Sequence, residues 1–357
     1  NYNLMQNLNF KAAVLFKQKQ KLRIIKIRPQ KTLLKGQVLV KIMYSGICGS
    51  QLGEISGVKG KDNFLPHLLG HEGTGIVKKL GPGVKYFKFN DKVILHWKKS
   101  KGIEAKNPIY YFKNNRINSG KVTTFSEFSV VSENRLTKIP KGLSYKDAVI
   151  FGCAATTGFG IVNRDVKIKK NKSSLIFGCG GVGINISQAA SINKSYPIIA
   201  IDKFAKRIQF TKKHGASHTI KFNGNFIDLR KKILQILENK PLDFFIDTTG
   251  NTKVIEFGLE IINPNNGNLV LVGVQKKNEK ISLNTLQLML GKKIIGTHGG
   301  NCQPNIDISK IYQSFKKNNI QISNFYTKTY SLDKINKAIS DMKNGNLNGR
   351  CLIKMHS

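Results

Sequence analysis

Two cysteines and one histidine are the residues of this sequence best suited to hold a metal ion. Cys48, His71 and Cys153 each lie beside glycines, in the segments 46–50, 70–73 and 152–158. Two thiolates and one imidazole leave the fourth position of a tetrahedral zinc open, as catalysis at the metal requires. Taken singly, a cysteine is more often a small buried hydrophobic residue and a histidine a hydrogen-bonded core residue, so both interpretations stay open.

A glycine-rich loop at 178–183 is the second group of residues that could do chemistry. Gly178, Gly180 and Gly183 fit the pattern G-x-G-x-x-G, with Gly181 and Val182 between the last two. The first glycine permits a tight turn, the second lets a pyrophosphate approach the backbone, and the third lets a helix pack closely on a strand. A helix that starts here offers free N–H groups to phosphate. The loop predicts a dinucleotide site, although the pattern alone also fits an ordinary glycine turn.

An acidic residue, Asp202, follows this loop at the spacing of about 20 residues that dinucleotide-binding units use for the ribose. A carboxylate there accepts hydrogen bonds from both ribose hydroxyls and repels a 2′-phosphate. This favours NAD over NADP, while Lys203, Lys206 and Arg207 close behind would soften the preference. The other interpretation of Asp202 is a solvated acid at the end of a strand.

The surrounding segments predict two kinds of structure. Short strands with turn signals between them fill the first half, for example at 38–42, 75–77, 92–95 and within 125–133. Beyond about residue 155, strands expected at 174–177, 197–202, 244–247 and 268–273 alternate with helices, among them 182–192 and 205–214. This alternation predicts a parallel sheet with crossover helices. From about Thr297 we expect a helical tail that ends in a strand at 350–353.

Length and composition limit the kind of protein. The chain has 357 residues, which suggests two domains, and 40% of them are hydrophobic, enough to build sizeable cores. No apolar run approaches the roughly 20 residues that span a membrane, and the start has no long apolar segment, so we expect neither a membrane helix nor a signal peptide. The five cysteines are odd in number and none has C-x-x-C spacing, which favours free thiols in a reducing cytoplasm.

Positive charge dominates the sequence: 59 Lys and Arg against 20 Asp and Glu give a formal net charge of +39. Most of the basic residues are Lys, scattered in ones and twos among many Asn and Ile. That pattern favours an AT-rich genome as the source of the Lys, Asn and Ile residues at surface positions. A surface that binds nucleic acid tends to use Arg instead. We therefore do not expect nucleic acid as a partner. A basic surface that attracts polyanions or phosphorylated substrates is the other interpretation.

Four of these segments follow the order of a known family's signatures. The segments 46–50, 70–77, 152–158 and 178–183 resemble those of the zinc-dependent medium-chain alcohol and polyol dehydrogenases, and the resemblance runs from Val38 to Arg350. It implies an α/β architecture, with a GroES-like β-rich catalytic domain and a Rossmann-type coenzyme domain built on a doubly wound parallel sheet. The catalytic domain would comprise 1–154 and 298–357, and the NAD-binding domain 155–297.

The resemblance also implies roles for individual residues. Cys48, His71 and Cys153 would ligate the zinc, Glu72 would stand behind the metal or ligate it transiently, and Ser50 would bind the substrate oxygen and take its proton. A second set would hold the cofactor: Thr157 at the nicotinamide ring, the backbone of Val272 and Val274 at the carboxamide, Lys203 and Asp202 at the adenosine ribose, and Arg350 near the pyrophosphate beside Gly178, Gly180, Gly181, Val182 and Gly183. A plain surface charge is the other interpretation of Arg350.

Three departures from the family's pattern bear on the chemistry. The family's structural zinc lobe is absent, because 96–122 contains no Cys, so we expect one catalytic zinc, no structural zinc and an exposed loop that shapes the substrate mouth. Gln51 replaces the acid that orients the zinc-binding histidine, which would make the imidazole less basic. Gly53 replaces the histidine that ends the proton relay, so protons would leave through water or a residue such as His67. The interpretation of His67 as a merely structural or exposed histidine is the favoured one.

The resemblance implies a zinc-dependent oxidoreductase that interconverts an alcohol (a polyol, a sugar, or a primary or secondary alcohol) and a carbonyl by hydride transfer with NAD(H). The pair Gly49-Ser50 resembles the polyol and sugar enzymes more than the simple alcohol enzymes. Two alternatives stay open: a zinc-free quinone or carbonyl reductase of the same superfamily, and a basic polyanion-binding protein that retains the fold. The segment 283–295 resembles the family's subunit-pairing edge strand, which implies a homodimer or a tetramer.

Overall fold

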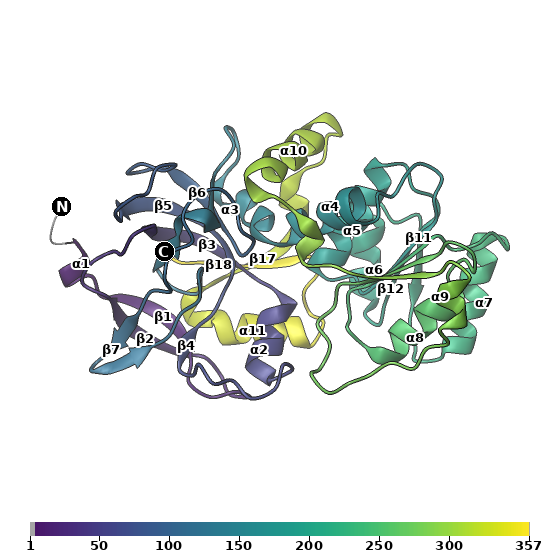
Figure 1. Ribbon diagram of the computed structural model, residues 1–357, viewed down its shortest axis with the longest axis horizontal. Helices are drawn as coiled ribbons and strands as arrows, with labels where there is room; N and C mark the ends of the chain where they lie inside the picture. The colour runs from purple at the N-terminus through teal and green to yellow at the C-terminus, as the bar shows by residue number, and fades with distance from the viewer. Residues whose placement is uncertain (1–3, 357) are drawn as a thin grey trace. The chain divides into compact units, whose positions relative to one another are not determined.

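The computed structural model describes residues 4–356, and the chain forms two compact units. The first unit contains the residues up to Gly57, residues 61–153 and those from Gln303 onward, and the second contains 58–60 and 154–302 (Figure 1). The expectation about a signal peptide concerns the start of the chain, whose first three residues lie outside the described part. No helix within 4–356 has both the length and the apolar character needed to span a bilayer.

Two sheets make up most of the first unit. One is antiparallel with the order β4-β1-β2-β7-β8, and the other has the order β10-β6-β5-β3-β18-β17 with β9 also paired to β3. The strands of the first are β1 (Phe10–Leu15), β2 (Arg23–Pro29), β4 (His67–Leu68), β7 (Tyr110–Phe112) and β8 (Asn115–Ile117). Those of the second are β3 (Gln37–Ile47), β5 (Glu72–Leu80), β6 (Lys92–His96), β9 (Phe128–Ser132), β10 (Leu136–Lys138), β17 (Tyr326–Ser331) and β18 (Arg350–Lys354).

The helices of the first unit are short apart from the 14-residue helix α10. They are α1 (Leu4–Asn7), α2 (Gly49–Ser56), α3 (Tyr145–Ala148), α10 (Pro304–Lys317) and α11 (Ile335–Lys343), with single turns at η1 (Glu133–Arg135), η2 (Val149–Gly152), η5 (Ile322–Phe325) and η6 (Leu332–Lys334). Helix α11 buries Ile335, Ala338 and Ile339, which lie three and four residues apart and so share one face.

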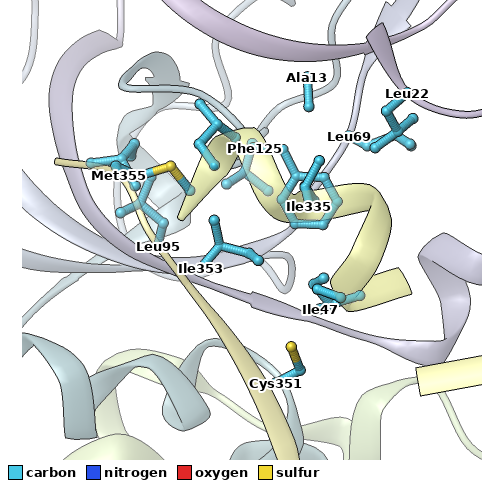
Figure 2. Packing of buried hydrophobic residues seen from close by; sticks show 14 of the residues in the cluster. Ala13, Leu22, Ile47, Leu69, Leu95, Phe125, Ile335, Cys351, Ile353 and Met355 are labelled. Carbon is cyan, nitrogen blue, oxygen red and sulfur yellow. The ribbon is translucent and has the colours of Figure 1, made fainter. Parts of the chain in front are cut away.

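The core of the first unit is built around β3, the strand with the most neighbours in its sheet. Val38, Val40 and Ile42 are fully buried on one face of β3, because side chains two residues apart in a strand point the same way. Figure 2 shows side chains from distant parts of the chain, including Ala13, Phe125 and Ile353, gathered in this core beside Ile335. Residues from both ends of the sequence therefore hold the strands that carry the site described below.

The second unit contains one parallel sheet with the strand order β13-β12-β11-β14-β15-β16. This is the doubly wound order. Successive strands are added on one side of β11 as far as β13, and then on its other side, starting with β14. The strands are β11 (Ser174–Phe177), β12 (Ile198–Asp202), β13 (His218–Lys221), β14 (Phe244–Asp247), β15 (Asn268–Leu271) and β16 (Lys293–Gly296). The predicted α/β architecture is confirmed.

Helices connect these strands and cover the sheet (Figure 1). They are α4 (Ala154–Gly160), α5 (Gly181–Ile192), α6 (Ala205–Lys212), α7 (Phe226–Leu237), α8 (Thr252–Ile261) and α9 (Leu286–Met289), with η3 (Ile161–Asp165) and η4 (Gly299–Asn301). Helix α5 packs on β11 and β12, and α8 packs on β14 and β15. Asn225 and Asn251 cap α7 and α8 by accepting backbone N–H hydrogen bonds, which explains where these helices start.

Two expectations about elements are wrong. The tail beyond Thr297 is not helical up to residue 350, because Tyr326–Ser331 forms β17, parallel to β18. This edge strand is mostly polar and only Tyr330 is buried, so it lacks the apolar run that marks a strand. The segment 283–295 is not a continuous edge strand either, since it contains the helical turn α9 and only its end belongs to β16.

Candidate functional site

The three predicted metal ligands meet inside the first unit. Their ligand atoms all lie within 4.8 Å of one another, and Sγ of Cys48 is 4.0 Å from Sγ of Cys153. That separation is far too long for a disulfide. Sulfurs bound at about 2.3 Å to a tetrahedral zinc lie roughly 3.8 Å apart, so the observed spacing suits two thiolates on one ion.

Strand pairing and glycines bring these ligands together. Cys48 follows the end of β3 and His71 precedes the start of β5, and the two strands pair so that Ser45 lies opposite Gly73. A Cβ on Gly46 would lie 2.3 Å from Oε1 of Glu72, and one on Gly152, just before Cys153, would lie 2.5 Å from the carbonyl of Leu95. Only glycine fits at both positions, which supports the interpretation that glycines permit the ligands to approach.

The buried Nε2 of His71 has no hydrogen-bond partner within residues 4–356, whereas its Nδ1 lies 2.5 Å from the side-chain amide of Gln51. An orphaned imidazole nitrogen facing two thiols is what a Cys₂His metal site requires when the ion is absent, so the residues present fit zinc. The thiol of Cys153, the Arg350 guanidinium and His71 hold the pKa of Cys48 well below its usual value despite burial. Cys48 is therefore the more readily ionised of the two thiols, since the same contact raises the pKa of Cys153, and both would bind zinc as thiolates.

Behind the ligands, Glu72 and Arg350 form a buried ion pair. Nε of Arg350 lies 2.6 Å from Oε1 of Glu72, its Nη2 lies 2.9 Å from Oε2, and the side chains are 3% and 0% exposed. Burial raises the pKa of Glu72, and the guanidinium opposes that rise. Glu72 is not part of the cluster of ligand atoms and Arg350 is not a surface charge, since each carboxylate oxygen faces the guanidinium.

Ser50 lies in the first turn of α2, two residues beyond Cys48. Its Oγ is buried and has no hydrogen-bond partner within the described chain. A buried hydroxyl without a partner is unfavourable, so Ser50 is a candidate to bind a group that is not part of the protein.

A cavity of about 520 Å³ lies within the first unit and reaches one of the three metal ligands, His71, but its lining includes neither cysteine nor Ser50. Gln51 and His71 line one part of it, and Arg116, Asn118 and Ser119 line another. His67 also lines the cavity, and its Nε2 lies 2.7 Å from Oδ2 of Asp62. The lining is thus rich in groups that hydrogen-bond or carry charge, which suits a polar ligand.

In the second unit, the glycine loop connects β11 to α5 as the pattern predicts. Gly178 has a φ of +104°, and a Cβ on Gly183 would lie 2.0 Å from the carbonyl oxygen of Gly178. At Gly180 a Cβ would meet nothing within 4 Å, so the backbone there faces open space. Helix α5 starts at Gly181 with no side-chain cap, which leaves the N–H groups of its first turn, including that of Val182, for a phosphate.

The carboxylate of Asp202 lies at the end of β12, next to this loop. Its Oδ2 accepts a hydrogen bond from the N–H of Cys179 at 2.8 Å, and its Oδ1 accepts one from the N–H of Phe204 at 2.9 Å. These bonds fix the orientation of the carboxylate and leave lone pairs for hydroxyl donors. Lys203 is exposed, and both its ammonium and the guanidinium of Arg207 lie over the Phe204 ring.

Apart from Arg350, which belongs to the first unit and pairs with Glu72, the remaining predicted cofactor residues lie in the second unit. Oγ1 of Thr157, on α4, is buried without a partner among the described residues. The N–H of Val272 donates to the carbonyl of Asp247, so its own carbonyl is the group left to contact a carboxamide. Val274 is 48% exposed, so it is accessible to a ligand.

Comparisons with known proteins match both sites to one family. Residues 34–141 match the alcohol dehydrogenase GroES-like domain, and residues 181–316 match the zinc-binding dehydrogenase domain. An S-(hydroxymethyl)glutathione dehydrogenase of Photobacterium damsela subsp. piscicida is 30% identical, over 94% of this chain and 97% of its own length. The chain belongs to the zinc-dependent medium-chain dehydrogenase family. It is an oxidoreductase of that family, whose cofactors are zinc and NAD.

Other relatives of this dehydrogenase agree. The S-(hydroxymethyl)glutathione dehydrogenase of Haemophilus influenzae is 29% identical, and the match covers 94% of both chains. The benzyl alcohol dehydrogenase of Acinetobacter calcoaceticus has a similar structure, with a TM-score of 0.85 at 22% identity over 98% of this chain and all of the other. A zinc-binding-domain alcohol dehydrogenase of Burkholderia ambifaria matches with a TM-score of 0.86, also at 22% identity. At such identities the two structures establish the shared fold.

Two carboxylates anchor the lysine-rich segment at 98–106 of this dehydrogenase. Glu133 is 1% exposed, and its carboxylate accepts hydrogen bonds from the backbone N–H groups of Lys85, Tyr86 and Ile103. Glu104 accepts two hydrogen bonds from Arg135, at 2.9 and 3.2 Å. Sequence analysis did not identify this network; the signal it overlooked was the presence of Glu104 and Glu133 in and beside a lysine-rich segment of a chain poor in acids. The segment is exposed at several lysines, but it is anchored.

Proposed function

We propose that this dehydrogenase uses a single zinc, held by Cys48, His71 and Cys153, and NAD, held by the second unit, to interconvert a polar alcohol and its carbonyl compound. The observation that carries the proposal is the meeting of three ligand atoms, distant in sequence, within 4.8 Å of one another. Among the residues that the structure describes, no second group of three or more His, Cys, Asp or Glu side chains has metal-binding geometry. Together with the lack of cysteines at 96–122, this supports one zinc per chain.

A zinc bound there supplies Lewis-acid polarisation of the substrate oxygen, and nicotinamide supplies the acceptor for the hydride. The chain's own part in alcohol oxidation begins at Ser50, whose partnerless Oγ would accept the hydrogen bond of the substrate hydroxyl and relay its proton, passing the hydrogen of its own hydroxyl on to water. Glu72 cannot join this proton transfer, because Arg350 holds both of its oxygens.

The second unit would be the coenzyme domain and the first the catalytic domain. The open space at Gly180 and the free N–H groups of α5 support binding of the pyrophosphate there. Asp202 favours NAD, because its oriented carboxylate can accept ribose hydroxyls and repels a 2′-phosphate. Thr157, Val272, Val274 and Lys203 remain candidate contacts of the nicotinamide and adenosine ends. Replacing Asp202 with Ser should lower the ratio of NAD to NADP use, measured as kcat/KM for each.

The cavity beside His71 supports a polar substrate. Asn118 and Ser119 offer hydrogen-bonding groups, and Arg116 offers a positive charge to an anionic substituent such as a carboxylate or phosphate. The panel that tests this contains simple alcohols, polyols, phosphorylated sugars and S-(hydroxymethyl)glutathione, the compound named for the relatives above. If Arg116 binds an anionic substituent, Arg116→Gln raises KM for anionic substrates and leaves KM for neutral alcohols unchanged.

Exposed and buried side chains support proposals about assembly and compartment. Leu286, Met289 and Leu290 are 54%, 83% and 61% exposed and precede β16, the last strand of its sheet. Such an apolar group beside an open sheet edge supports a homodimer, which sedimentation would detect, and a tetramer would need a further surface. None of the five cysteines, all within the described residues, forms a disulfide, and all are buried, which supports a reducing compartment such as the cytoplasm.

The decisive experiment measures metal content and activity together. The purified protein should contain one zinc per chain, and removal of the zinc should abolish activity. Cys48→Ala and His71→Ala should each abolish turnover while NAD still binds, because the loop at 178–183 belongs to the other unit. Full carbonyl reduction by zinc-free protein would show instead a zinc-free reductase of the same superfamily.

A further inference from the structure

The side chain of Gln51 sits between two of the proposed metal ligands. It is 1% exposed, its Oε1 accepts the backbone N–H of Cys48 at 2.8 Å, and its Nε2 lies 2.5 Å from Nδ1 of His71. An amide has one acceptor oxygen and one donor nitrogen, so the two sides of this group differ chemically. The contact with His71 is a hydrogen bond only if Nδ1 of the ring carries no hydrogen, because the amide nitrogen of Gln51 is a donor.

Without a metal, both contacts are satisfied. The Gln51 amide donates to Nδ1 of His71 if the ring hydrogen is on Nε2, the nitrogen that has no other partner. At the same time, Oε1 accepts the Cys48 N–H. The amide therefore matches the metal-free pocket.

With a metal on Nε2, the contacts conflict. Coordination needs the lone pair of Nε2, so the ring hydrogen moves to Nδ1, where it faces the N–H₂ of Gln51. Rotating the amide by 180° turns its oxygen toward Nδ1 but brings the N–H₂ against the N–H of Cys48. Either way one donor faces another donor. A carboxylate would accept both hydrogens.

We propose that Gln51 is a positioning residue that weakens zinc binding by Cys48, His71 and Cys153 and so makes the metal of this dehydrogenase exchangeable. The inference rests on the proposed function, because it takes these three residues as zinc ligands.

Two substitutions separate hydrogen bonding from charge. Gln51→Glu keeps the shape and supplies two acceptor oxygens, but it also adds a negative charge near the ion. Gln51→Met keeps the approximate size, adds no charge and removes the donor that opposes the Nδ1 hydrogen. If the donor conflict is real, both variants bind zinc more tightly than the natural chain, whereas added charge alone would affect only Gln51→Glu.

The experiment titrates Zn²⁺ into each metal-free protein in competition with a chromophoric chelator. We expect Gln51→Glu to bind zinc about 10- to 100-fold more tightly than the natural chain, the range by which partners of metal ligands change affinity. Gln51→Met should bind about two- to tenfold more tightly, since it relieves one neutral contact. Zinc loss to excess EDTA should slow in the same order.

A spectroscopic measurement follows the ring hydrogen directly. In ¹⁵N-labelled protein, the tautomer of His71 should change from Nε2–H to Nδ1–H when zinc binds to the natural chain. In Gln51→Glu the ring should carry its hydrogen on Nδ1 with and without metal. Circular dichroism of the metal-free proteins checks that each variant is folded; if Gln51→Met does not fold, the tautomer measurement on the natural chain and Gln51→Glu still decides.

The outcomes are distinguishable. Equal zinc affinities in all three proteins, or weaker binding by folded Gln51→Met, would overturn the role of Gln51 while leaving the zinc site in place. No zinc uptake by any of them would overturn the proposed function itself.

Discussion

His96, a buried histidine opposite Glu72 in the pairing of β5 with β6, gives the sharpest test of how burial changes protonation in this chain. His96 ends β6 and is 1% exposed; its Nδ1 lies 2.8 Å from the carbonyl of Lys98 and its Nε2 lies 2.9 Å from Oγ1 of Thr137. Burial lowers the pKa of His96 to about 4 from an ordinary 6.5. The neutral ring is therefore favoured in the folded chain, and the unfolded chain binds the extra proton more readily.

The sign and size follow from this difference. Because the folded pKa is depressed, the stability associated with neutral His96 is fully present above about pH 7 and is lost as pH falls through 6.5 toward 4. At about 1.4 kcal/mol per pKa unit, the loss reaches roughly 2 kcal/mol at pH 5 and roughly 3 kcal/mol at pH 4. His96→Asn keeps a donor for the Lys98 carbonyl and cannot titrate, so it should lack this loss.

The assay follows urea unfolding of the first unit through Trp97, the single tryptophan of the chain and the neighbour of His96. The free energy of unfolding is measured for both proteins between pH 4 and 8. The substitution also removes the Thr137 contact, which lowers stability by a constant amount at every pH. The two proteins differ in their free energy of unfolding, and the part of this difference that varies with pH measures the protonation of His96. All other titrating groups are common to both proteins.

A constant difference between the two proteins from pH 8 to pH 4 would refute the reasoning, because it would mean that His96 takes up its proton equally in the folded and unfolded chain. A difference that grows as pH falls, with His96→Asn gaining relative to the natural protein, is the expected result.

Two further predictions concern the ion pair and the glycine loop. Arg350→Leu should destabilise the first unit by about 3–5 kcal/mol, because it leaves Glu72 buried without its partner. Adding Glu72→Gln should restore part of the loss in the same Trp97 assay; no recovery would mean that the charge of Glu72 is not the cause. Gly183→Ala should destabilise the second unit by roughly 1–3 kcal/mol, since its Cβ would lie 2.0 Å from the carbonyl oxygen of Gly178. Gly180→Ala should leave thermal stability unchanged yet weaken NAD binding in calorimetry, and the opposite pattern would contradict the roles assigned to the two glycines.

Local sequence patterns predicted four of the six strands in the sheet of the second unit, β11, β12, β14 and β15. The strands at 174–177 and 244–247 and the helix that begins at the glycine loop lie where the apolar runs and glycines indicate. Parallel strands buried on both faces are short and continuously apolar, so each carries its own signal. The strand at 326–331 carries no such signal, because an edge strand with a solvent-facing side tolerates lysines and threonines, and only its partner β18 makes it a strand.

For the site, the kinds of ligand and the glycines beside them could be read from the amino-acid sequence, since residue type and φ preference are properties of single positions. Three contacts appear only in the folded chain: Cys48, His71 and Cys153 share one pocket, Arg350 pairs with Glu72, and Gln51 touches two ligands. Glu72 and Arg350 are 278 residues apart in sequence, and no local pattern links them. Strands β3, β5 and β18 place them together by hydrogen-bonded register, which is a property of the folded sheet.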